Sequence, residues 1–160
     1  MEHANIIDPS LIEIDIDLYI KEDILRKMAS NLVEGGYVKE TYVDAILQRE
    51  KTFPTGISTE PLGVAIPHAD VEHVIKPALS IATLKEPVKF LSMDDIETEI
   101  EVKIIFMLAI TNPEFQLDML RRLAYLFQNK EMLTRLAEAE DIDAMTRTLN
   151  EVISMNINKS

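Results

Sequence analysis

Cysteine is absent from this sequence of 160 residues, and long hydrophobic runs are absent as well. Without cysteine the chain has no disulfide framework, no thiolate chemistry and no zinc site built on thiolates. The richest apolar run, residues 104–110, has seven residues, about a third of the roughly 20 that a membrane-spanning helix needs. The first ten residues lack the basic start and apolar stretch of a signal peptide. We therefore predict a soluble, cytoplasmic protein that does not insert into a membrane.

Basic residues are scarce, with 16 Lys and Arg against 28 Asp and Glu and a net charge of −12. Phosphate backbones select Lys- and Arg-rich surfaces, so this balance argues against nucleic acid as a partner. The three histidines are scattered, and His68 and His73 miss the spacing with which HExxH helices pair metal ligands. The acidic run 94–101 lacks the glycine and the ligand order of a calcium loop. We expect no metal and no cofactor.

Hydrophobic residues form 47% of the chain, and no repeat, low-complexity tract or Pro/Gly/Ser-rich linker divides it. This composition predicts one domain over residues 1–160, with its core at about residues 11–154. Apolar periodicity and stop signals predict the secondary structure. Helices are predicted over residues 21–34, 40–50, from Asn112-Pro113 onward, near 130–138 and near 141–153. Strands are predicted over residues 11–17, 64–66, 79–84, 88–90 and 102–110.

The order of these elements indicates the fold class. Helices before, between and after strands are typical of an α/β layered sandwich, with a mixed, mostly parallel sheet flanked by helices. Residues 102–110 are almost wholly apolar, as expected for a central strand covered on both faces. Residues 53–56, FPTG, form a turn that ends the second helix.

His68 follows the short apolar strand in the stretch PLGVAIPHAD, residues 61–70. Pro67 cannot donate to a sheet ladder and favours the end of the strand at that point. The imidazole is then placed at the carboxyl end of a strand, where open α/β sheets bind ligands. A neutral imidazole is a competent nucleophile for a phosphoryl group. The same pattern is equally compatible with a packed histidine that a backbone carbonyl satisfies.

Arg49 lies at the end of the second predicted helix, just before the turn that leads to His68. A phosphorylated histidine carries a charge of about −2 and needs cationic or N–H neighbours. A guanidinium matches phosphate geometry with two donors at once. The alternative is a solvated arginine at a helix end, which the helix macrodipole favours.

Three stretches together resemble a known signature: QREK at residues 48–51, FPTGI at 53–57 and VAIPH at 64–68. They are similar to the IIA proteins of the bacterial phosphoenolpyruvate-dependent sugar phosphotransferase system, in the fructose/mannitol class. The signature consists of an arginine-bearing RE pair, a PTGI-like turn and a GxAxPH strand end. The resemblance extends over most of the chain, through the apolar strand and the helix after it.

The resemblance implies a covalent mechanism. In this family the phosphocarrier protein HPr donates a phosphoryl group to the IIA histidine, which passes it to a cysteine of a IIB component. The membrane component IIC then imports the sugar. Carried over to this sequence, His68 is the phosphorylated residue and Arg49 stabilises the phosphoryl group. An apolar rim would slow hydrolysis of phosphohistidine, and its candidate residues are Ile57, Leu62, Ile66 and Val71.

One position departs from the mannitol and fructose pattern. Those members have a second active-site histidine in the helix after the long strand, where this chain has Gln116. Gln116 can donate a hydrogen bond to a phosphoryl oxygen but cannot supply a titrating charge. Asn112-Pro113 with this glutamine, and the FPTGI turn, look like the galactitol-type branch. A family glutamate near the site corresponds to Glu60, although its offset from His68 differs from the mannitol pattern.

Two alternatives stay open from the sequence. A regulatory IIA-like module, whose histidine phosphorylation controls a partner protein, would share the same His68. A small α/β interaction domain with a purely structural His68 belongs to a different class.

Overall fold

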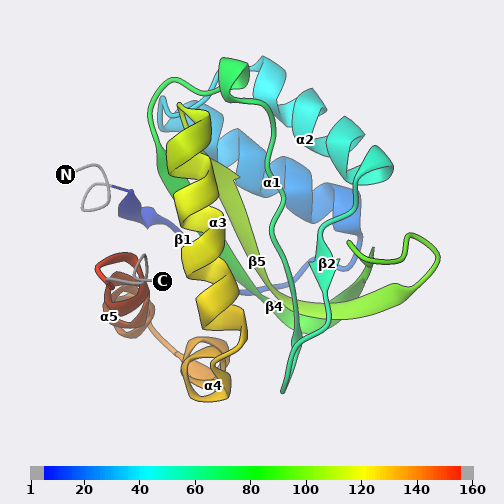
Figure 1. The fold of residues 1–160 in the computed structure, drawn as a ribbon, viewed down its shortest axis with the longest axis vertical. Helices are drawn as coiled ribbons and strands as arrows, with labels where there is room; N and C mark the ends of the chain where they lie inside the picture. Colours follow the sequence, from blue (N-terminus) through cyan, green and yellow to red (C-terminus); the bar gives the residue numbers. More distant parts are fainter. Residues whose placement is uncertain (1–5, 156–160) are drawn as a thin grey trace.

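One mixed sheet runs through the computed structural model, which describes residues 6–155 (Figure 1). Within that range the sheet has five strands in the order β1-β4-β5-β3-β2. β1 pairs with β4 and β3 pairs with β5 in parallel, whereas β4–β5 and β2–β3 are antiparallel. The elements along the chain are β1 (Ile7–Ile16), α1 (Lys21–Glu34), α2 (Thr41–Thr52), β2 (Gly56–Ile57), β3 (Gly63–Ala65), the short 3₁₀ helix η2 (Val71–His73), β4 (Ala78–Leu91), β5 (Glu99–Ala109), α3 (Pro113–Phe127), α4 (Lys130–Glu138) and α5 (Ile142–Ile153).

Helices cover both faces of the sheet, so the fold has three layers (Figure 1). α3, α4 and α5 pack on one face, and α1 and α2 pack on the other. Consecutive residues of β5 show this division. Phe106 and Leu108 belong to the core under α3, whereas Ile105 and Met107 belong to the core under α1. β5 can be a nearly continuous apolar run because neither of its faces meets water. The predicted α/β sandwich with a mixed sheet and a central β5 is confirmed.

The predicted helices are all present within a few residues of their expected bounds. α1 ends before Gly36, whose φ of 81° lies in the region that glycine enters without strain. α3 begins with Pro113 in its first turn, and the Asn112 side chain accepts a hydrogen bond from Phe115 N–H at 2.8 Å. None of the helices between residues 6 and 155 has the length and apolar character needed to cross a membrane.

One prediction was wrong: residues 79–84 and 88–90 are parts of a single long strand, β4. Residues 85–87 between them are exposed, and the register against β5 shifts between Thr83 and Val88. A polar break of this kind looks like a turn in the sequence, but pairing with β5 resumes beyond it and carries the strand onward. β2 was missed, because a strand of two residues is too short to show a period.

A buried arginine joins α3 to the C-terminal helix α5. Arg122 is 5% exposed, and its Nε lies 3.1 Å from an Asp118 carboxylate oxygen. Its Nη1 donates to the main-chain carbonyls of Val152, Ile153 and Met155 at the end of α5. The last carbonyls of a helix lack partners within the helix, so this guanidinium satisfies them and fixes α5 against α3.

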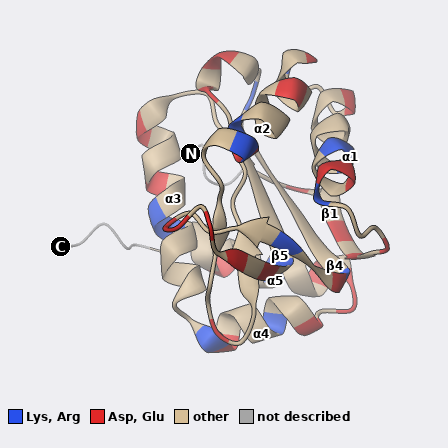
Figure 2. Ribbon diagram, turned by 90° about the vertical axis from the view of Figure 1, so that its right-hand side faces the viewer, with Lys and Arg blue, Asp and Glu red and all other residues tan. Residues whose placement is uncertain are grey.

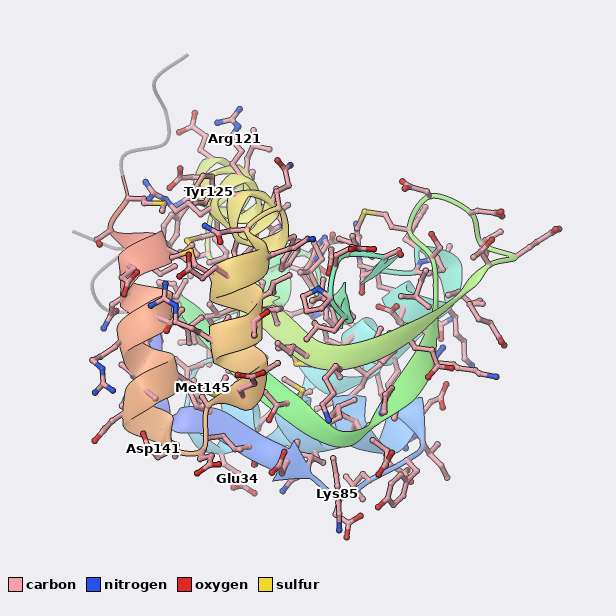
Figure 3. The ribbon with its side chains drawn as sticks, turned by 90° about the horizontal axis from the view of Figure 1, so that it is seen from below. Glu34, Lys85, Arg121, Tyr125, Asp141 and Met145 are labelled. Atoms are coloured by element: carbon pink, nitrogen blue, oxygen red, sulfur yellow. The ribbon has the colours of Figure 1, made fainter. Side chains whose placement is uncertain are left out.

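Replacing Arg122 with methionine should lower the free energy of unfolding by about 3 kcal/mol, because buried groups lose a charged partner. Urea denaturation followed by circular dichroism measures the change. The matched control is Arg121→Met. Arg121 is the exposed neighbour on the outer side of α3 (Figure 3), so its loss should change stability by less than about 0.5 kcal/mol. Equal destabilisation by the two variants would contradict the anchoring role of Arg122.

Candidate functional site

His68 lies just beyond β3, at the edge of the sheet where the parallel strands β3 and β5 both end. Pairing continues past the end of β3 in the same register, since Ala65 is opposite Ile105 and His68 is opposite Leu108. Pro67 has no N–H to donate, but its carbonyl accepts a hydrogen bond from Leu108 N–H at 3.0 Å. His68 therefore lies at the carboxyl end of a strand, as its sequence context predicted.

The imidazole of His68 is fixed by its own main chain. His68 Nδ1 lies 2.8 Å from the carbonyl oxygen of Ile66. A carbonyl oxygen can only accept, so Nδ1 carries the proton and donates. In the neutral ring the other nitrogen, Nε2, then has a free lone pair. Nε2 is consequently the ring nitrogen whose lone pair is available for bonding.

The surroundings of His68 lower its pKa below the ordinary value of 6.5. Partial burial is the largest cause, because it disfavours the charged imidazolium. The hydrogen bond to the Ile66 carbonyl opposes it and raises the pKa, the Arg49 charge lowers it, and the Asp70 carboxylate raises it. The lowered pKa leaves the imidazole neutral at pH 7, with the Nε2 lone pair available.

Arg49 is in the last turn of α2 and lines the same groove as His68. Its guanidinium lies over the Phe53 ring, 5.3 Å from the centroid, and its Nη1 lies 3.6 Å from an Asp70 carboxylate oxygen. Asp70 is 75% exposed, so this ion pair is solvated and contributes little stability. Arg49 Nε is buried and has no hydrogen-bond partner among residues 6–155. A cation with a spare buried donor beside a neutral imidazole is suited to binding an anion.

A groove of about 670 Å³ opens around His68. Its walls come from the end of α2 with the turn after it, from the loop between β4 and β5, and from α3. In Figure 2 the basic end of α2 lies above the acidic loop between β4 and β5. Of the predicted apolar rim, Ile57 and Ile66 line the groove, whereas Leu62 and Val71 do not. Its larger apolar residues are Phe53, Met93, Ile96, Leu120 and Phe127.

Two walls of the groove meet at Gly56, in the turn after α2. Gly56 pairs with Ser92, and its carbonyl accepts a hydrogen bond from Met93 N–H at 2.8 Å. A Cβ at Gly56 would lie 2.7 Å from the Leu91 carbonyl oxygen, which is too close for any side chain. Glycine thus permits the direct backbone contact between the turn and the loop.

The other two predicted site residues, Gln116 and Glu60, do not line the groove. Gln116 is one turn ahead of Leu120 on α3 and does not line the groove, but its Oε1 is buried without a hydrogen-bond partner in the described part of the chain. Glu60 is on the connection between β2 and β3 and is 81% exposed. Its carboxylate lies 3.8 Å from Lys130 Nζ at the start of α4. The structure therefore brings Arg49 to the groove of His68 and directs Glu60 toward α4.

Two buried polar residues at the groove were not predicted as site residues from the sequence. Glu50 is 4% exposed and Thr55 is 2% exposed. The Glu50 carboxylate accepts hydrogen bonds from the Thr55 N–H at 2.8 Å and from its hydroxyl at 2.9 Å. The signal that could have found Glu50 is spacing, since it follows Tyr42 and Ile46 at four-residue intervals on the buried face of α2.

Comparison with protein families settles what kind of protein carries this site. The model of the family described as "Phosphoenolpyruvate-dependent sugar phosphotransferase system, EIIA 2" matches residues 5–152. The chain belongs to this family. EIIA proteins of this type are phosphotransferases that work through a phosphohistidine intermediate, and the resemblance seen in the sequence is confirmed.

Three relatives illustrate the range of the EIIA match. The fructose-specific EIIABC component of Bacillus subtilis is 31% identical over 155 residues, which cover 94% of this chain but 23% of that longer protein. The galactitol-specific EIIA component of Escherichia coli is 29% identical over 116 residues, 72% of this chain and 77% of that one. In the solved complex of mannitol enzyme IIA with phosphorylated enzyme IIB from Escherichia coli, the matching chain has a TM-score of 0.72 and 27% identity. This match covers 89% of our chain and 95% of that chain.

The charges around His68 predict opposite pKa changes for two substitutions in this EIIA protein. Arg49→Gln should raise the His68 pKa, because it removes a positive charge that disfavours the imidazolium. Asp70→Asn should lower it, because it removes a negative charge that favours the imidazolium. A pH titration of the imidazole NMR signals measures both, with His73→Gln to assign the signal of His73. Shifts of the same sign in the two variants would contradict this account.

Proposed function

We propose that His68 is the phosphorylated residue of this EIIA protein, that HPr donates the phosphoryl group and that a IIB cysteine receives it. The observation that carries the proposal is the state of the imidazole. Nδ1 is bound to the Ile66 carbonyl, and Nε2 is free beside Arg49 in the groove. The solved mannitol IIA–IIB complex supports IIB as the acceptor, with the membrane component IIC reached through it. A protein with this phosphocarrier role would be located in the cytoplasm.

In the first step, His68 Nε2 attacks the phosphorus of phospho-HPr. A new N–P bond to Nε2 forms while the N–P bond to the HPr histidine breaks. The Nδ1 proton stays on the ring, hydrogen-bonded to the Ile66 carbonyl. In the second step the IIB thiolate attacks the same phosphorus, and the His68 imidazole leaves in its neutral form. Positioning and charge compensation carry such a transfer, because no protein proton has to move.

The groove supplies that compensation in this proposal. Arg49 faces a phosphoryl group with a charge of about −2 and has a buried Nε ready to donate. The N-terminal end of α3 lies at the same sheet edge as His68, and the positive end of its macrodipole favours an anion there. Gln116, near that end, would add a hydrogen bond from its carboxamide. The apolar walls would slow hydrolysis by excluding water. The contact of Glu60 with Lys130 lends no support to a role for Glu60.

We further propose that this EIIA protein serves a galactitol-type system. The support is Gln116 in place of the second histidine of mannitol and fructose members, together with the FPTGI turn at residues 53–57. The similarity to galactitol-specific EIIA of Escherichia coli agrees with it. Overall identity does not separate the branches, because the fructose-specific relative is 31% identical.

Incubation with phosphoenolpyruvate, enzyme I and HPr should add one phosphoryl group to the intact chain, measured by mass spectrometry at alkaline pH, where phosphohistidine is kept. His68→Ala should abolish the gain, because the nucleophilic Nε2 is removed. His73→Ala is the matched control and should keep the full gain, since His73 does not line the groove. No gain in the natural chain, or a gain that survives His68→Ala, would overturn the proposal.

The branch assignment predicts selectivity among acceptors. The phosphorylated chain should transfer to a galactitol-type IIB protein about tenfold faster than to a mannitol- or fructose-type IIB, a difference of about 1.4 kcal/mol in transition-state stabilisation. Single-turnover transfer to each purified IIB, followed by loss of the phosphoryl mass, measures it. Faster transfer to another type would refute the galactitol assignment, and transfer to none would favour a regulatory EIIA module.

A further inference from the structure

Hydrogen bonds link Glu50 to the imidazole of His68 through Thr55 and Ile66. The Glu50 carboxylate accepts both donors of Thr55, at 2.8 and 2.9 Å. The Thr55 carbonyl accepts the Ile66 N–H at 3.4 Å, and the Ile66 carbonyl accepts His68 Nδ1–H at 2.8 Å. The path is continuous from α2 to the His68 ring, and Thr55, Ile66 and His68 all line the groove.

At the Glu50 end of this path, the hydrogen bonds fix the orientation of Thr55. A buried carboxylate is costly, and desolvation raises the pKa of Glu50, a change that the two hydrogen bonds from Thr55 oppose. Stability alone would be served as well by an apolar side chain of similar size. A carboxylate that receives two donors from one residue fixes both the place and the orientation of that residue, which apolar packing does not.

The segment that Glu50 fixes is the part of the groove next to both functional groups. Thr55 lies between Phe53, on which the Arg49 guanidinium rests, and Gly56, where the turn touches the loop between β4 and β5. Displacement of Thr55 would move the carbonyl that holds Ile66. The Ile66 carbonyl in turn sets the tautomer and the plane of His68.

We propose that Glu50 is a positioning residue for phosphoryl transfer: through Thr55 and Ile66 it holds the His68 ring with Nδ1 protonated and Nε2 aimed into the groove. Glu50 exchanges no proton and does not touch the phosphoryl group. The kinetic part of this inference rests on the proposed function of His68. The effect of Glu50 on the His68 tautomer is independent of that function.

Two pairs of variants test the proposal. Glu50→Met removes the acceptor at nearly constant volume, whereas Glu50→Gln still accepts the Thr55 N–H and can donate to the Thr55 hydroxyl. Thr55→Val removes the hydroxyl, whereas Thr55→Ser keeps it. Circular dichroism checks that each variant folds, and ¹⁵N NMR of the His68 ring reports its tautomer. Stopped-flow mixing with increasing concentrations of phospho-HPr separates kcat from KM.

Glu50→Met should lower the fraction of His68 with Nδ1 protonated and reduce kcat about tenfold with KM unchanged. Glu50→Gln should restore both values, and Thr55→Val should show a smaller loss that Thr55→Ser does not. A folded Glu50→Met with an unchanged tautomer and kcat would overturn the proposal. So would Glu50→Gln as impaired as Glu50→Met, because charge would then matter instead of hydrogen bonding.

Two other outcomes of these experiments also have a defined reading. If Glu50→Met does not fold, the comparison of Thr55→Val with Thr55→Ser decides, and equal tautomer fractions in those two variants would overturn the proposal. If the natural chain accepts no phosphoryl group from phospho-HPr, the proposed function fails. The ¹⁵N spectra of the unphosphorylated variants then still decide whether Glu50 positions His68.

Discussion

The parallel pairing of β3 with β5 is the constraint on which the site depends. Parallel strands end at the same edge of a sheet, so the segment after β3 and the helix after β5 meet there. The register that sets Ala65 opposite Ile105 continues unbroken to His68 and Leu108. The Tyr42 hydroxyl, from the opposite layer, donates to the Leu108 carbonyl at 2.8 Å. The main chain that pairs with His68 is thus also held by a side chain of α2.

The fold was largely readable from the sequence because its signals are local and agree with one another. Gly35-Gly36 and Asn112-Pro113 mark helix ends, and the apolar run of residues 102–110 marks a strand buried on both faces. β4 was misread because residues 85–87 interrupt its apolar pattern. Only partner strands decide whether such an interruption is a turn or a bulge, and pairing between distant segments leaves no local signature.

The site was readable where chemistry depends on residue type and not where it depends on neighbours in space. His68 and Arg49 could be proposed from a strand end, a helix end and a motif. The tautomer of His68 could not, because it depends on a hydrogen bond to Ile66 that only the bent main chain creates. Glu50 was passed over for a similar reason, since its partner is met only after the chain has turned.

Glu60 and Gln116 show that closeness in sequence and closeness in space can differ. Glu60 lies close to the histidine in sequence, but the connection between β2 and β3 carries it toward α4 and Lys130. Gln116 is distant in sequence, yet it lies in the first turn of the helix that forms one wall of the groove. Sequence separation is a poor guide here, because a strand moves the chain about 3.3 Å per residue and away from its start.

The contact at Gly56 has a mechanical consequence. Because the turn after α2 is hydrogen-bonded to the loop between β4 and β5, main-chain contacts hold these two walls of the groove together. Another wall of the groove is α3, which Arg122 anchors to the end of α5. A protein that enters the groove would therefore meet one wall tied together by main-chain hydrogen bonds and an opposite wall, α3, whose place depends on the anchorage of the C-terminal helix.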